Sequence, residues 1–495
     1  MRVRAFDRFG RPPAPDVCRR FSAYGAPRVR FVPGHRTGTR RCAFPAHSTS
    51  NARSWGALRA PDFACPAHRP RWAAIEGSPR SHTRARPELA RIWFQRGCLA
   101  AEIGRPPMGA SDEFEYDPFA ANFHDRSHEI YRHLRDEHPL YHNRERGFWA
   151  ISRFEDVRQA AIEIEALTTE TIEEAASLLP MLNFLDPPRH NRLRALVSRG
   201  FTSRRVSEME PHLRRIAGAL LDELAGREEC DLVEDFATPL PGRIIAEMIG
   251  VPLDRRETFL GHTRKMIATN PESTIAEAIR EPSDRIYEEF GRLLEERRGE
   301  PRDDLMSALI DAEIDNEGLL DDEILGFCYQ LIVAGNDSTT SLIGNGAVLL
   351  ANHPDQRKRL VEDPAKIPNA VEEMLRFESP AQALPRQSRR PYSLHGKTIP
   401  ADQRVLLVWA AANRDDREFE EPERFDITRS ITRHIAFGHG VHFCLGASLA
   451  RLEARIAFET LLERHPNYRL IEEPGWIPSR WARAHKEIRI ALPDS

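Results

Sequence analysis

One cysteine near the C-terminus lies in a loop punctuated by glycines. The segment 437–446 reads FGHGVHFCLG and contains Cys444, and an amphipathic pattern from Ala447 to Leu462 predicts a helix directly after it. Glycines let a backbone approach a ligand closely, and the positive end of a helix dipole favours an anionic thiolate. This layout is typical of a cysteine that holds a haem iron. The alternative is a buried structural cysteine, which leaves the several constrained positions around it unexplained.

The segment resembles the haem-binding loop of the cytochrome P450 monooxygenases, F-G-x-G-x-H-x-C-x-G, at every fixed position. The resemblance implies that Cys444 is the axial thiolate of a haem b iron, that Phe437 packs beside the sulfur, and that His442 contacts a haem propionate. It extends from about Tyr116 to the C-terminus. It also implies the cytochrome P450 fold, mainly α with a smaller β subdomain, in which a long central helix lies over the haem.

The longest predicted helix, Asp321 to Asn352, contains residues that disfavour helix interiors. Glycine costs about 1 kcal/mol relative to alanine there, and Asp, Ser and Thr prefer caps and turns. The run AGNDSTT at 334–340 therefore predicts a functional distortion, in which a hydroxyl bonds back to a carbonyl and opens room for water or oxygen. The alternative is a helix that packs small residues against a neighbour.

This run resembles the A-G-x-[DE]-T-T motif with which the P450 monooxygenases activate O2. Asp337 matches the acid, Ser338 stands where a threonine is usual, and Thr339 matches the following hydroxyl position. An acid, an alcohol and water form a proton relay, so the resemblance implies that these residues are catalytic. Serine keeps the hydroxyl but lacks the methyl group that restricts the rotamer of threonine.

Further donors are expected at the haem edge. The segment DPPRHNRLR at 186–194 resembles the H-x-x-x-R helix of the family, and its spacing places His190 and Arg194 on one helix face. Arg386 matches a family position that reaches a propionate. Together with His442, these residues would supply donors for both carboxylates of a haem. The alternative for the helical pair is two exposed polar residues.

Glu373 and Arg376 are spaced to pair on a helix that is predicted to begin near Pro368. Most such pairs are surface ion pairs worth about 0.2–1 kcal/mol. The local sequence, however, resembles the E-x-x-R helix of the family, which implies a structural ion network that supports the haem core. Arg414 or Arg424 is expected to complete that network.

The first 107 residues differ in composition from the remainder. They hold 21 arginines, no lysine and six acidic residues, a net charge of +15, so the remaining residues carry −19 of the chain's net −4. Residues 1–107 are not expected to bury enough apolar area to fold. A transit peptide, a basic arm for nucleic acid or membrane, and translation from upstream of a start at Met108 are the open interpretations. Arginine without lysine indicates nucleotide bias and favours the last, which leaves residues 108–495 as the haem domain.

Helical periodicity dominates after Met108, and strand-like segments are short. Helices are predicted at 125–136, 154–164, 188–200, 203–225, 232–249, 283–298 and 303–314, and strands within 140–152, 390–394, 404–407 and 488–492. The stretch between Pro252 and Pro282 gives no clear pattern.

No apolar run is long enough for a transmembrane anchor, and no secretory signal follows Met1 or Met108. The sparse, irregular cysteines Cys230, Cys328 and Cys444 argue against a disulfide framework. A cytoplasmic protein with no membrane anchor and no nucleic-acid partner is therefore expected.

No flavin-binding unit follows Cys444, so electrons are expected from a separate protein, and the resemblance implies a ferredoxin and its reductase. Arginines near the cysteine are candidates for that contact or are ordinary solvated side chains; they are Arg192, Arg199, Arg204, Arg205, Arg433 and Arg451.

The pocket that the resemblance implies is mostly apolar, so a lipophilic small molecule is expected to be oxidised with O2. Its implied lining is 178–184, parts of 259–283, 332–336, 381–384 and 479–483. A haem-thiolate enzyme of other chemistry, such as a peroxygenase or a coupling enzyme, and a non-catalytic haem-binding sensor are the alternatives.

Overall fold

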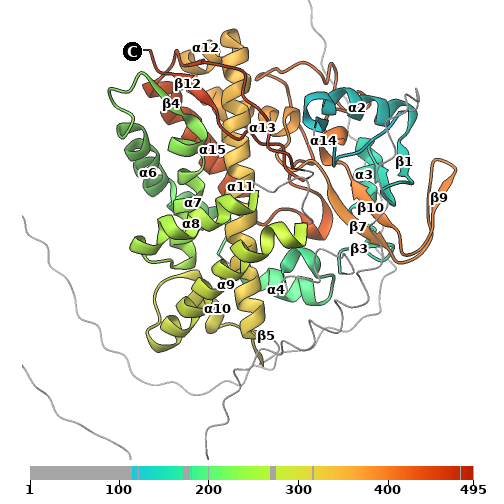
Figure 1. Cartoon of the computed structure of the whole chain (residues 1–495), viewed down its shortest axis with the longest axis horizontal. Helices are drawn as coiled ribbons and strands as arrows, with labels where there is room; N and C mark the ends of the chain where they lie inside the picture. The colour runs from blue at the N-terminus through green and yellow to red at the C-terminus, as the bar shows by residue number, and fades with distance from the viewer. Residues whose placement is uncertain are drawn as a thin grey trace, which may run out of the picture. The chain divides into compact units, whose positions relative to one another are not determined.

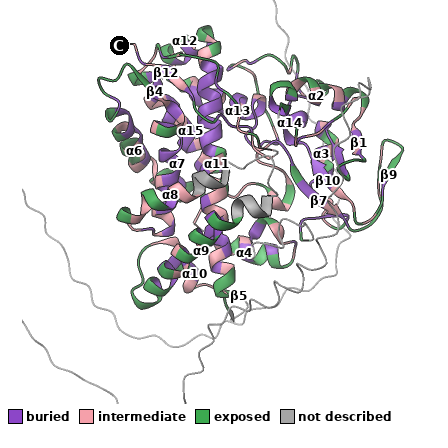
Figure 2. Cartoon of the chain, in the orientation of Figure 1, coloured by how far each residue is buried: buried purple, intermediate pink, exposed green. Residues whose placement is uncertain are grey.

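The helix predicted from Asp321 to Asn352 forms over those residues as α11, the longest helix of the structure. Its first turn is acidic, and the Glu323 carboxylate accepts the Leu320 N–H at 3.0 Å. Pro354 begins the next helix and prevents α11 from continuing. In Figure 1, α11 runs through the body of the molecule with helices on both sides, and Figure 2 shows much of its C-terminal half buried.

The computed structural model describes residues 114–120, 122–170, 179, 181–198, 200–267, 275–314, 317–479 and 481–493. The interpretations of residues 1–107 and the candidate contact at Arg199 lie outside these residues. Within the described part, no helix is long and apolar enough to cross a membrane.

The main helical core packs α11 against α7 (Pro239–Ile249), α13 (Ile367–Phe377) and α15 (Ala447–Arg464). Gly346 permits a close approach, because a Cβ there would lie 2.5 Å from Phe458 and 2.7 Å from the Met374 sulfur. The packing of α15 against α11 places the cysteine loop, which directly precedes α15, next to the central helix.

The remaining helices cover this core or the sheet (Figure 1). They are α2 (Phe123–Glu137), α3 (Phe154–Ala160), α4 (Arg189–Val197), α5 (Ser203–Glu208), α6 (Glu210–Asp222), α8 (Leu253–Ile267), α9 (Ile275–Gly299), α10 (Leu305–Ile310), α12 (Pro354–Glu362) and α14 (Trp409–Ala412).

Proline explains several differences from the predicted helices. The pattern at 203–225 is divided at Met209, because Pro211 fits only the first turn of a new helix, α6. The pattern at 232–249 is a π turn over Val233–Ala237 followed by α7, which Pro239 begins. The predicted start of α9 at Ser283 is wrong, because the helix begins at Ile275 and continues through Pro282.

A five-stranded sheet lies beside α2, α3 and α14 (Figure 1). Its order is β1 (Leu140–Asn143), β2 (Phe148–Ile151), β10 (Arg404–Leu407), β7 (Leu384–Ser388) and β3 (Leu167–Thr168). The β2–β10 pair is parallel and the other pairs are antiparallel. The predicted hairpin within 140–152 and the strand at 404–407 are confirmed.

Smaller sheets complete the fold. One joins β11 (Arg469–Leu470), β12 (Arg489–Ala491) and β4 (Glu229–Asp231), and two ribbons pair β5 (Glu313–Ile314) with β6 (Glu317–Gly318) and β8 (Tyr392–Leu394) with β9 (Lys397–Ile399). The described residues are thus mainly helical with a smaller β part, as the sequence predicts.

Candidate active site

The loop before α15 holds Cys444 by its own backbone. The Cys444 N–H donates to the Phe437 carbonyl at 2.9 Å and closes the loop. Gly438 and Gly440 have φ angles of 72° and 75°, which side chains rarely adopt. A Cβ on Gly440 would also lie 3.2 Å from the Ala161 carbonyl, so this glycine is needed for close approach as well as for backbone conformation.

The Cys444 sulfur is surrounded by groups that favour its anionic form. The backbone N–H groups of Gly446 and Ala447 at the start of α15, and the positive charges of Arg194 and Arg451, act to lower the pKa of its thiol. Burial raises the pKa of the Cys444 thiol, and these donors and charges oppose that rise. A metal ion bound at the sulfur would therefore meet a site already arranged for a thiolate.

A set of buried donors lies at the other end of this loop. The rings of His190 on α4 and His442 are 4.5 Å apart, and Arg386 on β7 is 4% exposed. His190 Nε2, His442 Nδ1 and Arg386 Nε have no hydrogen-bond partner among the described residues. Burial lowers the pKa of both histidines and lowers that of Arg386 to about 10.

Arg194, four residues after His190, does not join this set directly. Its guanidinium donates to the Phe443 carbonyl at 2.5 Å, on the cysteine side of the loop. Burial lowers its pKa, and the Cys444 charge opposes that.

Asp186 also belongs to this end of the site. Its carboxylate is 3% exposed, accepts hydrogen bonds from Thr168 and from Thr169 at 3.0 Å, and lies 3.4 Å from His442 Nε2. Burial raises its pKa, but hydrogen bonds from His442 and the threonines outweigh that effect and lower it to about 2. Sequence reasoning used Asp186 only as part of the helix motif.

The AGNDSTT run on α11 combines exposed and buried polar groups. Ala334 and Ser338 are exposed in the middle of the helix, and the Ser338 hydroxyl donates to the Ala334 carbonyl at 2.8 Å, as predicted. The helix nevertheless continues unbroken through this run. The alternative of small-residue packing also has support, because a Cβ on Gly335 would lie 2.4 Å from Ile245 on α7.

Asp337 and Thr339 lie in different surroundings on the same run. Asp337 Oδ1 is buried without a partner among the described residues, and burial raises the pKa of Asp337 well above its usual value. Burial therefore favours the protonated form of Asp337. Thr339 is buried and hydrogen-bonds the Glu453 carboxyl of α15. Burial raises the pKa of Glu453 to about 8, a second protonated acid that sequence reasoning missed.

Comparison with known proteins decides the family. The family model described as Cytochrome P450 matches residues 180–468. The chain is 40% identical over 384 residues to Cytochrome P450 107B1 of Saccharopolyspora erythraea, covering 74% of this chain and 92% of that one. It is 38% identical over 368 residues to a Vitamin D(3) 25-hydroxylase of Pseudonocardia autotrophica, covering 72% and 90%.

Among solved structures, CYP109E1 of Bacillus megaterium in complex with testosterone has a TM-score of 0.68 and 33% identity, covering 74% of this chain and 99% of that one. The chain belongs to the cytochrome P450 family. It is a monooxygenase, and its cofactor is haem b, whose iron this family holds through a cysteine thiolate.

The residues of this P450 fit haem b. The Cys444 sulfur suits an iron ligand, and the unpartnered nitrogens of His190, His442 and Arg386 suit the anionic propionates, because a neighbouring anion favours the protonated, donating form of each imidazole. Buried donors without partners are costly in a folded protein, so anions at this edge would remove that cost.

The ion network of α13 differs from the prediction in one residue. Glu373 and Arg376 are fully buried and joined by hydrogen bonds of 2.7 and 2.8 Å, as expected for a structural pair. The third member is Arg429, whose Nε lies 3.2 Å from the Glu373 carboxylate.

The predicted choice of Arg414 or Arg424 is therefore wrong. Arg414 pairs with Glu423 and lies 3.7 Å from the centre of the Phe377 ring, and Arg424 is an exposed partner of Glu421 at 3.1 Å. The spacing of the arginines along the chain could not show which guanidinium contacts Glu373, because the path of the loop after α14 decides it.

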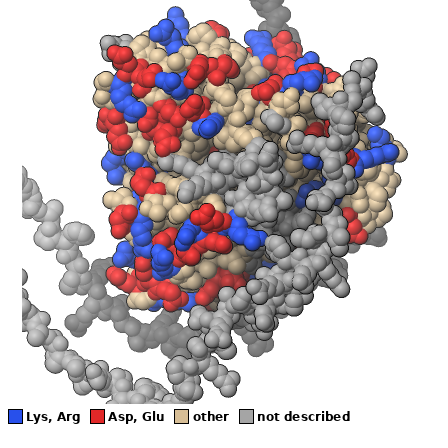
Figure 3. All heavy atoms as spheres, in the orientation of Figure 1, with Lys and Arg blue, Asp and Glu red and all other residues tan. Residues whose placement is uncertain are grey.

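The arginines near the cysteine are mostly engaged by acids. Arg204 pairs with Glu208 at 2.9 Å, Arg433 with Glu418 at 2.7 Å, and Arg451 with Glu372 at 2.6 Å. Figure 3 shows acidic and basic side chains interspersed over the described surface of the face drawn. Ion pairing thus offsets much of the positive charge that the sequence places there.

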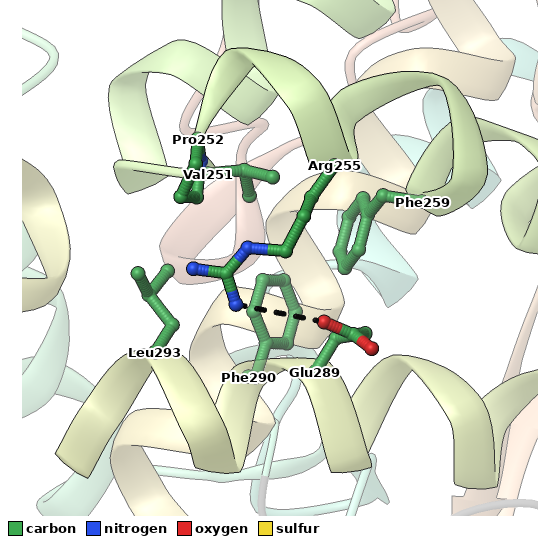
Figure 4. Close-up of a pocket in the computed structure, with 7 residues that line it drawn as sticks. All are labelled: Val251, Pro252, Arg255, Phe259, Glu289, Phe290 and Leu293. Carbon is green, nitrogen blue, oxygen red and sulfur yellow. Dashed lines mark ion pairs between the residues drawn. The ribbon is translucent and has the colours of Figure 1, made fainter. Parts of the chain in front are cut away.

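A separate cavity lies between α8 and α9 (Figure 4). Arg255 and Glu289, 3.8 Å apart, line it together with Phe259 and Phe290, and its volume is about 10 Å³. A volume of this size holds at most a single water molecule, so it is not a substrate pocket.

Proposed function

We propose that Cys444 is the axial thiolate of haem b and that the chain inserts one oxygen atom from O2 into a lipophilic small molecule. The observation that carries this is the closed loop directly before α15, in which the Cys444 N–H donates to the Phe437 carbonyl at 2.9 Å and Gly438 and Gly440 have positive φ angles. Haem b, when bound, supplies the activation of O2 that makes this insertion possible.

The propionate end is assigned to His190, Arg386 and His442. Their orphaned nitrogens support this, and Asp186 holds His442 from the other side. Arg194 is assigned to the same edge by the motif, although its guanidinium donates to the loop carbonyl of Phe443. Phe437 is assigned to the sulfur side, where its carbonyl accepts the Cys444 N–H.

Proton delivery is assigned to Asp337 and Ser338. Burial raises the pKa of Asp337, and its Oδ1 has no partner among the described residues, so this carboxyl can hold and give up a proton. The exposed hydroxyl of Ser338 next to it can pass a proton on to a group bound at that face. Thr339 is assigned a connecting role. It links α11 to the protonated Glu453, away from the exposed face.

The substrate is assigned to the lipophilic class. Ala334 is exposed on the inner helix, and Leu384 is 42% exposed although it begins a strand inside the five-stranded sheet. Open space beside such residues suits an apolar ligand. The relatives named for vitamin D3 hydroxylation and seen with testosterone act on or hold molecules of this kind.

The electron donors are assigned to a ferredoxin and its reductase. The arginines near the cysteine support an acidic partner, although acidic neighbours already pair with Arg204, Arg433 and Arg451.

The test is the spectrum of the reduced protein with carbon monoxide, for the full chain and for Cys444→Ala. We expect the red-shifted band of a thiolate-ligated haem in the full chain and its complete loss in the variant. The matched control is Cys328→Ala, which removes a buried free cysteine from α11 and should keep the band. A band typical of imidazole ligation in the full chain would overturn the assignment.

Turnover separates the alternatives. Oxygen consumption with NAD(P)H, ferredoxin and ferredoxin reductase should rise when a bound lipophilic compound is added, and a hydroxylated product should form. Product formed from hydrogen peroxide alone would indicate a peroxygenase, and haem binding without product in either assay would indicate a sensor.

A further inference from the structure

A second carboxylate on α13, Glu372, joins three elements on the sulfur side of the site. Its oxygens accept hydrogen bonds from Arg451 of α15 at 2.6 and 2.9 Å, in a two-point contact. They also accept one from His434 at 2.9 Å. Glu372 directly precedes Glu373, which belongs to the structural network, so its backbone lies on a rigid part of the molecule.

The His434 ring is fixed by a second hydrogen bond. Its Nδ1 accepts the N–H of Ala436 at 3.2 Å, so this nitrogen carries no proton and Nε2–H is the donor to Glu372. Burial raises the pKa of Glu372, but hydrogen bonds from His434 and Arg451 outweigh that effect and lower it to about 2. Glu372 is therefore an anion held at two points over the working pH range.

Arg451 lies between this carboxylate and the cysteine loop. Its guanidinium is 4.5 Å from the centre of the Phe437 ring, in a cation–π contact. Phe437 in turn accepts the Cys444 N–H through its carbonyl, and the charge of Arg451 lowers the pKa of Cys444. The chain of contacts thus runs from Glu372 through Arg451 to the sulfur.

We propose that Glu372 is a positioning residue, which holds the Arg451 guanidinium over Phe437 beside the Cys444 sulfur and thereby raises the reduction potential of the iron. This proposal rests on the proposed function, because it needs Cys444 as the iron ligand. Arg451 has 37% of its side chain exposed, so without Glu372 the ring of Phe437 is its remaining contact among the described residues. A positive charge near the metal stabilises the reduced state, whose charge is more negative, and water would screen that charge if it moved outward.

The experiment measures the ferric–ferrous potential of the haem-loaded full chain by spectroelectrochemistry. Arg451→Leu should lower the potential, because a positive charge is lost. Glu372→Gln should lower it too, because Arg451 is released. If Glu372 acted only through its own charge, its removal would raise the potential. The sign of the Glu372→Gln shift therefore separates positioning from simple charge.

The chain offers a matched control on the same side. Glu418 binds Arg433 at two points of 2.7 Å, and the Arg433 guanidinium lies 5.1 Å from the centre of the Phe154 ring. The residue types and contacts are the same, but Phe154 does not hold the cysteine loop. Glu418→Gln should leave the potential unchanged.

The double variant gives the second measurement. In the native background, Glu372→Gln should change the ratio of ferrous to ferric protein several-fold at a fixed applied potential. A tenfold change in this ratio corresponds to about 59 mV for a one-electron couple. The same substitution should add nothing in the Arg451→Leu background, because it acts through Arg451. An unchanged or raised potential in Glu372→Gln, or full additivity in the double variant, overturns the proposal.

If Glu372→Gln does not take up haem, Arg451→Lys is the variant that tests the proposal instead. Lysine keeps the charge but cannot form the two-point contact and stacks less well, so the potential should fall toward that of Arg451→Leu. An unchanged potential in this variant counts against positioning. The carbon monoxide spectrum distinguishes the two failures: if thiolate ligation persists in every variant while the potentials do not move, only the role of Glu372 falls. If the native chain lacks that spectrum, both proposals fall.

Discussion

The polar groups around Cys444 and those in the AGNDSTT run of α11 differ in whether they have partners. Around Cys444, charges are paired: Glu372 with Arg451, and Glu373 with Arg376 and Arg429. On α11, Asp337 Oδ1 and the side-chain amide atoms of Asn336 are buried and have no partner among the described residues. Paired groups fix a ligand in place, whereas an unpaired acid is free to exchange a proton. We therefore assign the holding of the ligand to the region around Cys444 and proton exchange to α11.

The largest effect should come from breaking the paired region. Glu373→Ala leaves the fully buried Arg376 without its carboxylate, and loss of one partner of a buried pair costs about 3–5 kcal/mol. We expect the free energy of unfolding in urea to fall by that amount and haem retention to fall with it. Glu421→Ala breaks the exposed pair with Arg424 and should cost less than about 1 kcal/mol. Equal losses in the two variants would remove the contrast between the regions.

Substitution of the unpaired acid on α11 should lower the turnover rate while the protein stays folded. Asp337→Asn removes the ionisable proton, and we expect turnover to fall about 10²–10³-fold, the range typical of a lost general acid. Haem content and the carbon monoxide spectrum should be unchanged. Asp321→Asn, in the first turn of the same helix, is the control and should keep its activity. An unchanged product rate in Asp337→Asn would dismiss this acid from the relay.

Ser338→Ala tests whether the exposed hydroxyl directs protons. We expect product formed per O2 consumed to fall several-fold and hydrogen peroxide to rise, because the relay loses one member. Ser341 makes the same kind of back-bond, to the Asp337 carbonyl at 2.8 Å, but is buried. Ser341→Ala should therefore stay coupled. Tightly coupled oxygen use in Ser338→Ala would point to Thr339 or to water instead.

The last prediction concerns pH and Glu453. Its pKa of about 8 lies above the usual value of 4.5, so the folded state binds more protons than the unfolded state between these pH values, and stability falls as pH rises through that window. Glu453→Gln removes this dependence. The stability of the variant relative to the native chain should grow with pH by at most about 1.4 kcal/mol per unit within the window, and thermal unfolding at a series of pH values measures it. A constant difference from pH 5 to pH 8 would show that Glu453 ionises normally.

Much of the site could be predicted because its signals are local. The glycines at 438 and 440 are needed by backbone angles within the loop, and α11 begins and ends where capping acids and Pro354 stand. Pairs spaced three or four residues apart on one helix, such as Glu373 and Arg376, also follow from the sequence. By contrast, Pro282 misled the prediction of α9, because tertiary packing of the helix overrides the local penalty.

The sequence by itself determined the cysteine loop, the bounds of the central helix and the residue types offered to the haem edge, because each depends on neighbours within a few positions. Only the tertiary structure decided that Arg429 completes the buried ion network, that Thr339 hydrogen-bonds Glu453, and that Glu372 holds Arg451 over Phe437. Those contacts join elements far apart in the chain. A long guanidinium or a hydroxyl has several acids of suitable charge available, and the packing of the helices selects which one lies within reach.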